Sequence, residues 1–338
     1  MNLATGGSLL VYFMTTAALA FTGVGLATAW ASRHGVLALP GARQSHTVAT
    51  PTGSGIGLVA AVVLAAGLPG PGAGLPASWI AGVLPGMTVL CLVGWWDDRR
   101  TVHAGLRLAV QVAVSLWLLA CLRNGWSPGV QAIWLAAPAL LGLVGLMNAW
   151  NFMDGSNGMA GAQGLFTGLV LAGLFVMAGQ GGLALAALGV AAACAGFLPW
   201  NIPRARVFMG DAGSVPLGFA VGGLLLLGWQ SGAVSLAVAV LLPTLFWVDA
   251  GLTLGRRFLR GEQWYTAHRQ HVYQRLISDG RSHKQVLALY QAINLFVVLP
   301  GVVLGTFYPG VAWPVTGMLI LVMITAWQFA SLKAGEKT

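Results

Sequence analysis

The chain has 338 residues, of which 57% are apolar and only 7% are charged, with 48 glycines and 14 tryptophans. Soluble domains carry about 25% Asp, Glu, Lys and Arg, so this chain has too few polar groups to cover a water-exposed surface. A soluble protein is therefore excluded, and the high hydrophobicity also argues against a disordered chain or a nucleic-acid-binding protein. The net charge of +9 comes from 17 Lys and Arg against 8 Asp and Glu, and its meaning depends on where these residues lie.

Apolar windows long enough to cross a bilayer recur along the whole chain. A hydrocarbon core about 30 Å thick requires roughly 20 helical residues. We therefore predict an all-α, polytopic membrane protein that forms a single integral-membrane domain over residues 1–338. Eleven spans are expected, at Gly7–Ala31, Ser54–Leu68, Trp79–Trp96, Leu106–Leu122, Val130–Met147, Met159–Ala178, Leu183–Pro199, Val215–Trp229, Ala233–Val248, Gln285–Thr306 and Val311–Ala330.

With eleven spans, the connecting segments fall into two alternating sets, and one set carries nearly all the charge. It holds every Lys and Arg except Arg123, all 8 acids and all 6 histidines. The positive-inside rule assigns this set to the cytoplasm, which places the N-terminus outside and the C-terminus inside. Candidate functional groups are therefore expected on the cytoplasmic face, in segments 32–53, 97–107, 148–158, 200–214 and 249–284.

The first two charged segments carry weak signals when each is taken alone. Arg43 and His46 precede a glycine-rich stretch, residues 50–57, whose backbone N–H groups suit phosphate oxygens near a helix start. A bare turn that enters a helix is the alternative and explains this stretch more simply. Asp97 and Asp98 end an apolar span beside two arginines, as expected for a metal site or a proton acceptor. A solvated, charge-paired helix end is the alternative.

The third segment, NAWNFMDGSNG at 148–158, is more specific, because three amides and one carboxylate occupy eleven residues between apolar spans. Asn148 and Asn151 are three residues apart and share one face if the segment is helical. Such an oxygen-rich cluster suits Mg²⁺, which takes one or two carboxylates plus substrate phosphates. An ordinary polar turn is the alternative.

The last two segments add a glycine-flanked acid and a basic stretch. FMGDAGS at 208–214 places Asp211 directly before a span, where glycines let a ligand approach the backbone. Segment 249–284 contains an arginine cluster and the sequence HRQHVYQ. The arginines suit phosphate oxygens or anionic lipid. The HxxH pair lacks a third ligand at zinc-like spacing, so zinc is not expected.

Together these segments supply acids for a divalent cation, glycines and arginines for phosphates, and a membrane scaffold. The expected substrates are a phosphorylated soluble donor and a lipid phosphate acceptor. Phosphoryl transfer between them requires positioning and charge neutralisation more than a covalent apparatus.

Five segments resemble, in order and across nearly the whole chain, the polyprenyl-phosphate N-acetylhexosamine-1-phosphate transferases (glycosyltransferase family 4). The matching sequences are RQSH…TP, WWDDRR, NAWNFMDGSNG, FMGDAGS and HRQHVYQ. The resemblance implies transfer of a sugar 1-phosphate from a UDP-N-acetylhexosamine to undecaprenyl phosphate, with release of UMP. It further implies Mg²⁺ (or Mn²⁺) as cofactor, the inner membrane of a bacterium as location with the active site facing the cytosol, no nucleic-acid partner, and a homodimer.

The resemblance also implies roles for individual residues. Asp97, Asp98 and Asp154 match catalytic acids, and the first two are implicated in metal binding and activation of the lipid phosphate. Asp211 matches the acid that holds Mg²⁺, with Asn151 as its amide co-ligand. The implied substrate-binding residues are Arg43, His46, Arg107, Asn148, Asn157, Phe208, His268, Arg269 and His271.

Two departures bear on the branch of the family. Peptidoglycan enzymes usually have Asp at the position of Asn157 and a run of histidines where this chain has HRQHVYQ. Both features resemble the O-antigen and capsule branch, so N-acetylglucosamine 1-phosphate or a deoxy-N-acetylhexosamine 1-phosphate is the expected group. A MurNAc-pentapeptide phosphotransferase of the peptidoglycan type is the alternative. Thr52 stands where relatives often have Arg, which weakens a role for that position.

Other classes explain the sequence less well. A transporter predicts inverted repeats and polar groups near the membrane midplane, whereas here the polar groups gather at one face. A CDP-alcohol phosphotransferase would carry the pattern DGxxAR…GxxxDxxxD, which this sequence lacks. A non-enzymatic scaffold in a glycan-assembly complex would not require clustered acids.

Overall fold

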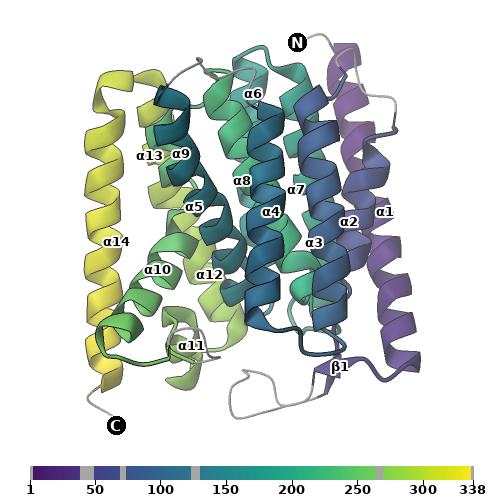
Figure 1. Ribbon diagram of the computed structural model, residues 1–338, viewed down its shortest axis with the longest axis vertical. Helices are drawn as coiled ribbons and strands as arrows, with labels where there is room; N and C mark the ends of the chain where they lie inside the picture. Colours follow the sequence, from purple (N-terminus) through teal and green to yellow (C-terminus); the bar gives the residue numbers. More distant parts are fainter. Residues whose placement is uncertain (1–2, 39–48, 69–73, 123–129, 264–268, 336–338) are drawn as a thin grey trace.

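The computed structural model describes residues 3–38, 49–68, 74–122, 130–263 and 269–335. These residues form a helical bundle with almost no strand, which confirms the predicted all-α, polytopic membrane fold (Figure 1). The α-helices are α1 (Leu3–Arg33), α2 (Gly55–Ala65), α3 (Leu84–Asp97), α4 (Ala104–Leu122), α5 (Val130–Met153), α6 (Met159–Met177), α7 (Gly181–Asn201), α8 (Asp211–Gln230), α9 (Leu236–Leu241), α10 (Thr244–Leu259), α11 (Val272–Ser278), α12 (His283–Ile293), α13 (Leu299–Phe307) and α14 (Ala312–Gly335).

Short irregular elements complete the bundle. A π-helical turn precedes α3 (η1, Trp79–Val83), another joins α12 to α13 (η3, Asn294–Val298), and a 3₁₀ turn precedes α14 (η4, Pro309–Val311). Strands β1 (Leu37–Ala38) and β2 (Thr50–Pro51) form one antiparallel pair, with Leu37 opposite Pro51.

Nine helices of the described chain are long and apolar enough to cross a membrane. They match nine of the eleven expected spans. The expected span Ser54–Leu68 is the 11-residue helix α2, which at 1.5 Å per residue covers only about 17 Å. Its short length follows from the turn that ends it at Ala66–Leu68.

The expected span Ala233–Val248 is divided between α9 and α10, because Pro243 interrupts the helical hydrogen-bond ladder. Side chains satisfy a carbonyl beside the break. Thr244 Oγ1 donates to the carbonyl of Val240 at 3.2 Å, and Trp247 Nε1 donates to the same oxygen at 3.0 Å. Broken helices at membrane depth persist when their backbone groups are satisfied within the protein.

The helix ends that carry the charged segments meet at one end of the bundle. The start of α1 and the end of α14 lie at opposite ends, and β1, α11 and the α3–α4 connection share the end where α14 terminates (Figure 1). Helix α8 lies in the interior, with 89% of its apolar window buried, and packs against α3, α5 and α2. Its N-terminus therefore lies at the centre of the charged end.

Candidate active site

Helices α3 and α8 are joined at the charged end through Asp98. This residue follows the last residue of α3, and its carboxylate accepts two backbone hydrogen bonds from the start of α8. The N–H of Asp211 donates to Oδ1 at 3.0 Å, and the N–H of Ala212 donates to Oδ2 at 3.1 Å. Asp98 thus caps a helix N-terminus, where the exposed N–H groups and the helix dipole stabilise a negative charge.

Two glycines permit this contact. At Gly94, a Cβ atom would lie 2.3 Å from the carbonyl oxygen of Asp211, so only glycine lets the two backbones approach this closely. Gly210 adopts φ +69°, and a Cβ there would lie 2.4 Å from the Asp98 carboxylate. The left-handed conformation favours glycine because side chains clash in it. The glycine that precedes Asp211 is therefore required by the backbone conformation.

The glycine-rich stretch 50–57 supports the same region rather than presenting open N–H groups. The N–H of Ser54 and the N–H of Gly55 donate to the carbonyls of Phe208 and Met209, at 3.3 and 2.9 Å. The N–H of Phe208 in turn donates to the carbonyl of Pro51 at 2.8 Å. The N–H groups of Ser54 and Gly55 are therefore already occupied. This favours a turn that enters a helix over a phosphate-binding loop.

Arg107, on the first turn of α4, bridges two acids. Its Nη1 lies 2.6 Å from Asp97 Oδ2 and 3.0 Å from Asp211 Oδ2. The second oxygen of Asp97 accepts the backbone N–H of Val102 at 2.6 Å. The Arg107 side chain is 37% exposed, so its ion pairs with Asp97 and Asp211 contribute little to stability. The same exposure makes its guanidinium accessible to an anionic ligand.

Helix α5 contributes the amides expected from the third segment. Asn151 Nδ2 donates to Asp211 Oδ1 at 2.6 Å and to Ser214 Oγ at 3.1 Å. Asn148 lies one turn earlier, and its Nδ2 donates to Gln111 Oε1 on α4 at 2.8 Å. Because the segment is helical to Met153, the two asparagines share one face, as predicted.

Asp154 follows α5 and completes the acid cluster. Burial and then the negative charges of Asp98 and Asp211 hold the pKa of its carboxyl well above the usual value, against the opposing effect of the backbone N–H of Gly210. Burial, and then the charge of Asp211, raises the pKa of Asp98 to about 8, against the opposing effect of its two backbone hydrogen bonds. Among the described residues, this cluster contains four acids and one guanidinium, that of Arg107. The four acids are Asp97, Asp98, Asp154 and Asp211.

A bound cation would relieve the repulsion among these acids, and the donors present suit Mg²⁺. No group of three His, Cys, Asp or Glu side chains in the described residues forms a protein-only metal site. Asp211 and Asn151 instead offer one carboxylate and one amide. Rotating the Asn151 amide by half a turn would point its oxygen, rather than its nitrogen, toward Asp211. Mg²⁺ binds through one or two carboxylates together with substrate phosphates. The residues therefore fit an ion that a diphosphate substrate completes.

Asn157 and Phe208, which are expected to contact the nucleotide, lie on two segments that are joined by hydrogen bonds. Asn157 Nδ2 donates to the carbonyl of Pro203 at 3.3 Å. Asn201 joins the same two segments, because its Oδ1 accepts the N–H of Gly158 and its Nδ2 donates to the carbonyl of Val207 at 2.7 Å. Phe208 is the residue after Val207 and is half-buried. Asn157 and Phe208 therefore lie on segments fixed by one buried side chain.

The basic segment is arranged around a residue that the sequence did not single out. Asp249 of α10 is 4% exposed, and both of its oxygens accept the N–H of Val272 at the start of α11, at 3.0 and 3.1 Å. Tyr290 Oη and Trp327 Nε1 also donate to it, each at 3.3 Å. Asp249 therefore joins α10, α11, α12 and α14. The only sequence signal for Asp249 was its position as a single acid at the end of an apolar span.

The remaining residues expected to bind substrate lie in the segments before α2 and before α11. His271 is buried, with Nδ1 3.7 Å from Asp249 Oδ1, whereas Arg269 is exposed on the loop before α11. Arg43, His46 and His268 lie outside the described residues. Gln111, Ser214 and Asn201 join the site through hydrogen bonds, although the sequence pattern did not mark them.

Comparison with known proteins places these features in a family. A family model described as glycosyl transferase family 4 matches residues 80–229, which contain Asp97, Asp98, Arg107, Asn151, Asp154 and Asp211. A decaprenyl-phosphate N-acetylglucosaminephosphotransferase of Mycolicibacterium smegmatis is 30% identical over 95% of this chain and 88% of its own.

Two further relatives carry related names. A Bacillus subtilis protein named as a probable undecaprenyl-phosphate N-acetylglucosaminyl 1-phosphate transferase is 26% identical over 80% of this chain and 77% of its own. A phospho-N-acetylmuramoyl-pentapeptide-transferase of a Synechococcus species is 39% identical over 59% of this chain and 62% of its own. The chain therefore belongs to glycosyl transferase family 4, the superfamily of polyprenyl-phosphate N-acetylhexosamine-1-phosphate transferases.

Proposed function

We propose that this protein transfers an N-acetylhexosamine 1-phosphate from a UDP-sugar to undecaprenyl phosphate and releases UMP. The observation that carries the proposal is the convergence of α3, α5 and α8 on one end of the bundle, where Asp98 caps α8 and Asn151 and Arg107 contact Asp211. The relatives named for polyprenyl phosphate acceptors support the same reaction. This end is proposed to face the cytoplasm, because the positive-inside rule favours that side for the charged connections, and the bacterial relatives support a bacterial inner membrane as the location.

In the proposed reaction, an oxygen of the lipid phosphate attacks the β-phosphorus of the donor. The bond between that phosphorus and the bridging oxygen breaks, and its electron pair leaves with UMP. Mg²⁺, held by Asp211 and Asn151, would neutralise charge on the diphosphate. Arg107 offers a further cation to the same phosphates. At neutral pH the lipid phosphate is already largely ionised, so Asp97 and Asp98 serve mainly to orient the acceptor and the surrounding helices.

A covalent aspartyl intermediate is the competing scheme. In the structure both oxygens of Asp98 accept backbone hydrogen bonds, and both oxygens of Asp97 are engaged by Val102 and Arg107. These hydrogen bonds lower the nucleophilicity of both carboxylates, which supports direct displacement. Release of UMP from donor alone, together with a trapped phosphosugar-enzyme, would refute direct displacement.

The group transferred is proposed to be N-acetylglucosamine 1-phosphate or a deoxy-N-acetylhexosamine 1-phosphate, for O-antigen or capsule synthesis. Two of the relatives are named for N-acetylglucosamine, which supports the former. The peptidoglycan-type reaction is the second candidate, because the Synechococcus relative is 39% identical over its matched region. The homodimer implied by the family is part of the proposal and is tested by sedimentation in detergent.

One assay separates these candidates. The purified protein is incubated with undecaprenyl phosphate and a panel of UDP-N-acetylhexosamines that includes UDP-MurNAc-pentapeptide, and the lipid product is identified by mass spectrometry. We expect UMP and a lipid-linked N-acetylhexosamine diphosphate. Product from UDP-MurNAc-pentapeptide alone would replace the first candidate by the second. No UMP release with any donor would refute the proposed function.

A further inference from the structure

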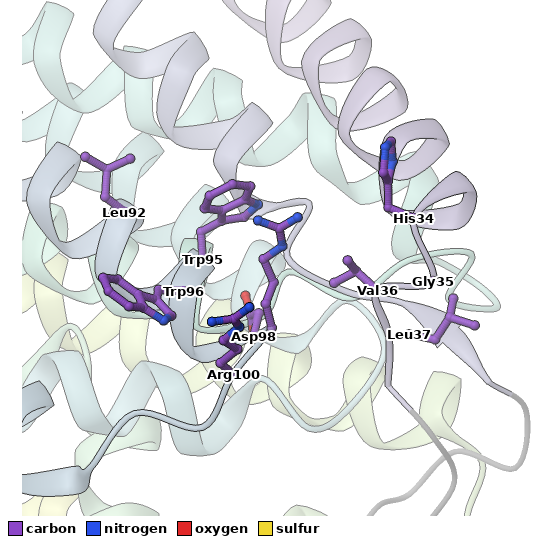
Figure 2. Close-up of a pocket in the computed structure, with 10 residues that line it drawn as sticks. His34, Gly35, Val36, Leu37, Leu92, Trp95, Trp96, Asp98 and Arg100 are labelled. Carbon is purple, nitrogen blue, oxygen red and sulfur yellow. The ribbon is translucent and has the colours of Figure 1, made fainter.

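The hairpin formed by α11 and α12 contacts the short connection that links α5 to α6. This connection, residues 154–158, begins with the acid Asp154 and contains Asn157, which is expected to contact the nucleotide. The open cavity of about 720 Å³ at the end of α3 lies elsewhere, since it is lined by residues within 34–37 and 92–100 (Figure 2). The contacts of the hairpin are therefore separate from that cavity.

Three side chains of the hairpin lie against successive parts of the connection. At Gly155, a Cβ atom would collide with Oη of Tyr273 on α11, and at Gly158 a Cβ atom would lie 2.9 Å from Cδ2 of Leu287 on α12. His283, the first residue of α12, contacts the two residues between these glycines. The hairpin thus follows the connection over its whole length.

His283 joins the hairpin to the connection through hydrogen bonds. The backbone N–H of Asn157 donates to Nδ1 of His283 at 3.4 Å, and Oγ of Ser156 lies 3.0 Å from the same nitrogen. Because a backbone N–H can only donate, Nδ1 is the acceptor, and the neutral imidazole carries its proton on Nε2. Ser156 is 4% exposed, so little water reaches its hydroxyl. His283 therefore fixes both the hydroxyl of Ser156 and the backbone of Asn157.

The imidazole is presented from a helix start that is itself held in place. The N–H of Gln285 donates to Oγ of Ser282 at 3.2 Å, and the N–H of Ser282 donates to Oε1 of Gln285 at 2.9 Å. Such a capping box fixes the direction in which the chain enters a helix. Asp249 accepts hydrogen bonds from both α11 and α12, so the whole hairpin is anchored to α10.

The segment after α7 holds the connection from another direction. The side-chain amide of Asn157 donates to the carbonyl of Pro203 at 3.3 Å, and Asn201 accepts the N–H of Gly158. Asn157 is therefore restrained at its side chain by Pro203 and at its backbone by His283. Without the imidazole, the N–H of Asn157 loses its acceptor, and the turn is free to rotate about the remaining contacts.

We propose that His283 is a positioning residue for the UDP-sugar donor, because it holds Ser156 and Asn157 in the conformation that presents the Asn157 side chain to the nucleotide. The proposal rests on the function proposed above and on the expected contact between Asn157 and the nucleotide. The effect of His283 passes through Asn157, so its loss weakens donor binding and leaves binding of the lipid acceptor unchanged.

The first test compares the two substrates in His283→Ala. The full chain is reconstituted in phosphatidylcholine vesicles, and KM is determined for UDP-N-acetylglucosamine at saturating undecaprenyl phosphate and for undecaprenyl phosphate at saturating donor. Loss of the two contacts at Nδ1 is expected to raise the donor KM by about tenfold. The acceptor KM and kcat are expected to change by less than about twofold.

Two conservative variants separate the hydrogen bonds from packing. His283→Asn places an amide oxygen close to the position of Nδ1 and is expected to keep the donor KM within about threefold of wild type. His283→Gln places its amide near Nε2 instead, and its donor KM is expected to resemble that of His283→Ala. Lys284→Gln changes the adjacent exposed residue and should leave both KM values at the wild-type level. If His283→Ala does not fold, Ser156→Ala removes one of the same contacts, with an expected rise of about threefold in the donor KM.

Two measurements without turnover separate failure of this contact from failure of the proposed function. UMP binding in the presence of Mg²⁺ is measured by isothermal titration calorimetry, and hydrogen–deuterium exchange is followed in peptides that cover residues 154–160. In His283→Ala we expect an about tenfold higher Kd for UMP and faster exchange at residues 155–158. Both changes would support the positioning role even if no UDP-sugar were turned over.

Other outcomes overturn the proposal. It is refuted if the UMP Kd and the donor KM of His283→Ala equal those of wild type, if the acceptor KM rises in parallel with the donor KM, or if the asparagine and glutamine variants behave alike. A wild-type protein that neither binds UMP nor turns over any UDP-sugar would refute the proposed function and this proposal together.

Discussion

Replacing Gly94 by alanine is predicted to disrupt the acid cluster without touching any polar side chain. The new Cβ atom would lie 2.3 Å from the carbonyl oxygen of Asp211 and 2.6 Å from the backbone nitrogen of Ala212, whereas ordinary contact begins at 3.4 Å. Because both neighbours are backbone atoms, no side-chain rotation relieves the clash. Helices α3 and α8 must therefore separate by about 1 Å, the difference between these distances.

The magnitude follows from this displacement. The hydrogen bonds from the N–H groups of Asp211 and Ala212 to Asp98 measure 3.0 and 3.1 Å, and a further 1 Å or so breaks both. Overpacking of this kind costs about 1–3 kcal/mol of the free energy of unfolding. A misplacement of about 1 Å at reacting groups costs about 100-fold in rate. Gly94→Ala is thus expected to fold with a lowered Tm and to lose about 99% of its turnover.

The assay is UMP release by purified protein, with Tm measured in the same detergent. Gly142→Ala is the matched control, because Gly142 lies in helix α5 and a Cβ there meets nothing within 4 Å. Alanine is preferred over glycine in a helix by about 1 kcal/mol, so this control should keep full turnover and an equal or higher Tm. Wild-type turnover and Tm in Gly94→Ala would refute the reasoning.

Three further predictions concern the metal ligand Asp211, the buried acid Asp249 and removal of the metal ion. Asp211→Asn removes the carboxylate that contacts Arg107 and Asn151, so UMP release should fall by at least about 1000-fold with the Tm nearly unchanged; wild-type turnover would show that the metal assignment is wrong. Asp249→Ala leaves the donors on Val272, Tyr290 and Trp327 without an acceptor, so the free energy of unfolding should fall by about 3 kcal/mol; an unchanged denaturation midpoint would contradict the four-helix junction. Chelation with EDTA should abolish UMP release and added Mg²⁺ or Mn²⁺ should restore it, whereas full turnover in EDTA would remove the metal from the mechanism.

Apolar length and charge pattern were enough to predict the overall architecture. Each of the nine long helices found among the described residues coincides with an apolar window, because the bilayer fixes the length of a span. The two differences have local causes. A proline at 243 divides one predicted span, and that residue was visible in the sequence as a helix breaker. The early end of α2 is set by a turn that apolar composition does not reveal.

The acids of the site were predictable, but most of the contacts that hold them in place were not. Asp97, Asp98 and Asp211 occur at span ends, so their shared face follows from the parity of the spans. That Asp98 would bond the backbone of α8 depends on the close approach at Gly94, and contacts between distant segments leave no mark in one sequence. Gln111 and Asp249 were missed for the same reason, since their partners lie on other helices.

The central claim is that sequence-distant acids surround one divalent ion when the donor is present, and iron-directed cleavage tests it most directly. Fe²⁺ replaces Mg²⁺ in the purified protein with UDP-N-acetylglucosamine, ascorbate and peroxide generate hydroxyl radicals at the ion, and the backbone cuts are mapped by mass spectrometry. We expect cuts near Asp98, near Asn151–Asp154 and near Asp211 together, lost when Mg²⁺ is in excess. Cuts confined to one of these segments, or cuts on helix ends at the opposite end of the bundle, would contradict the account.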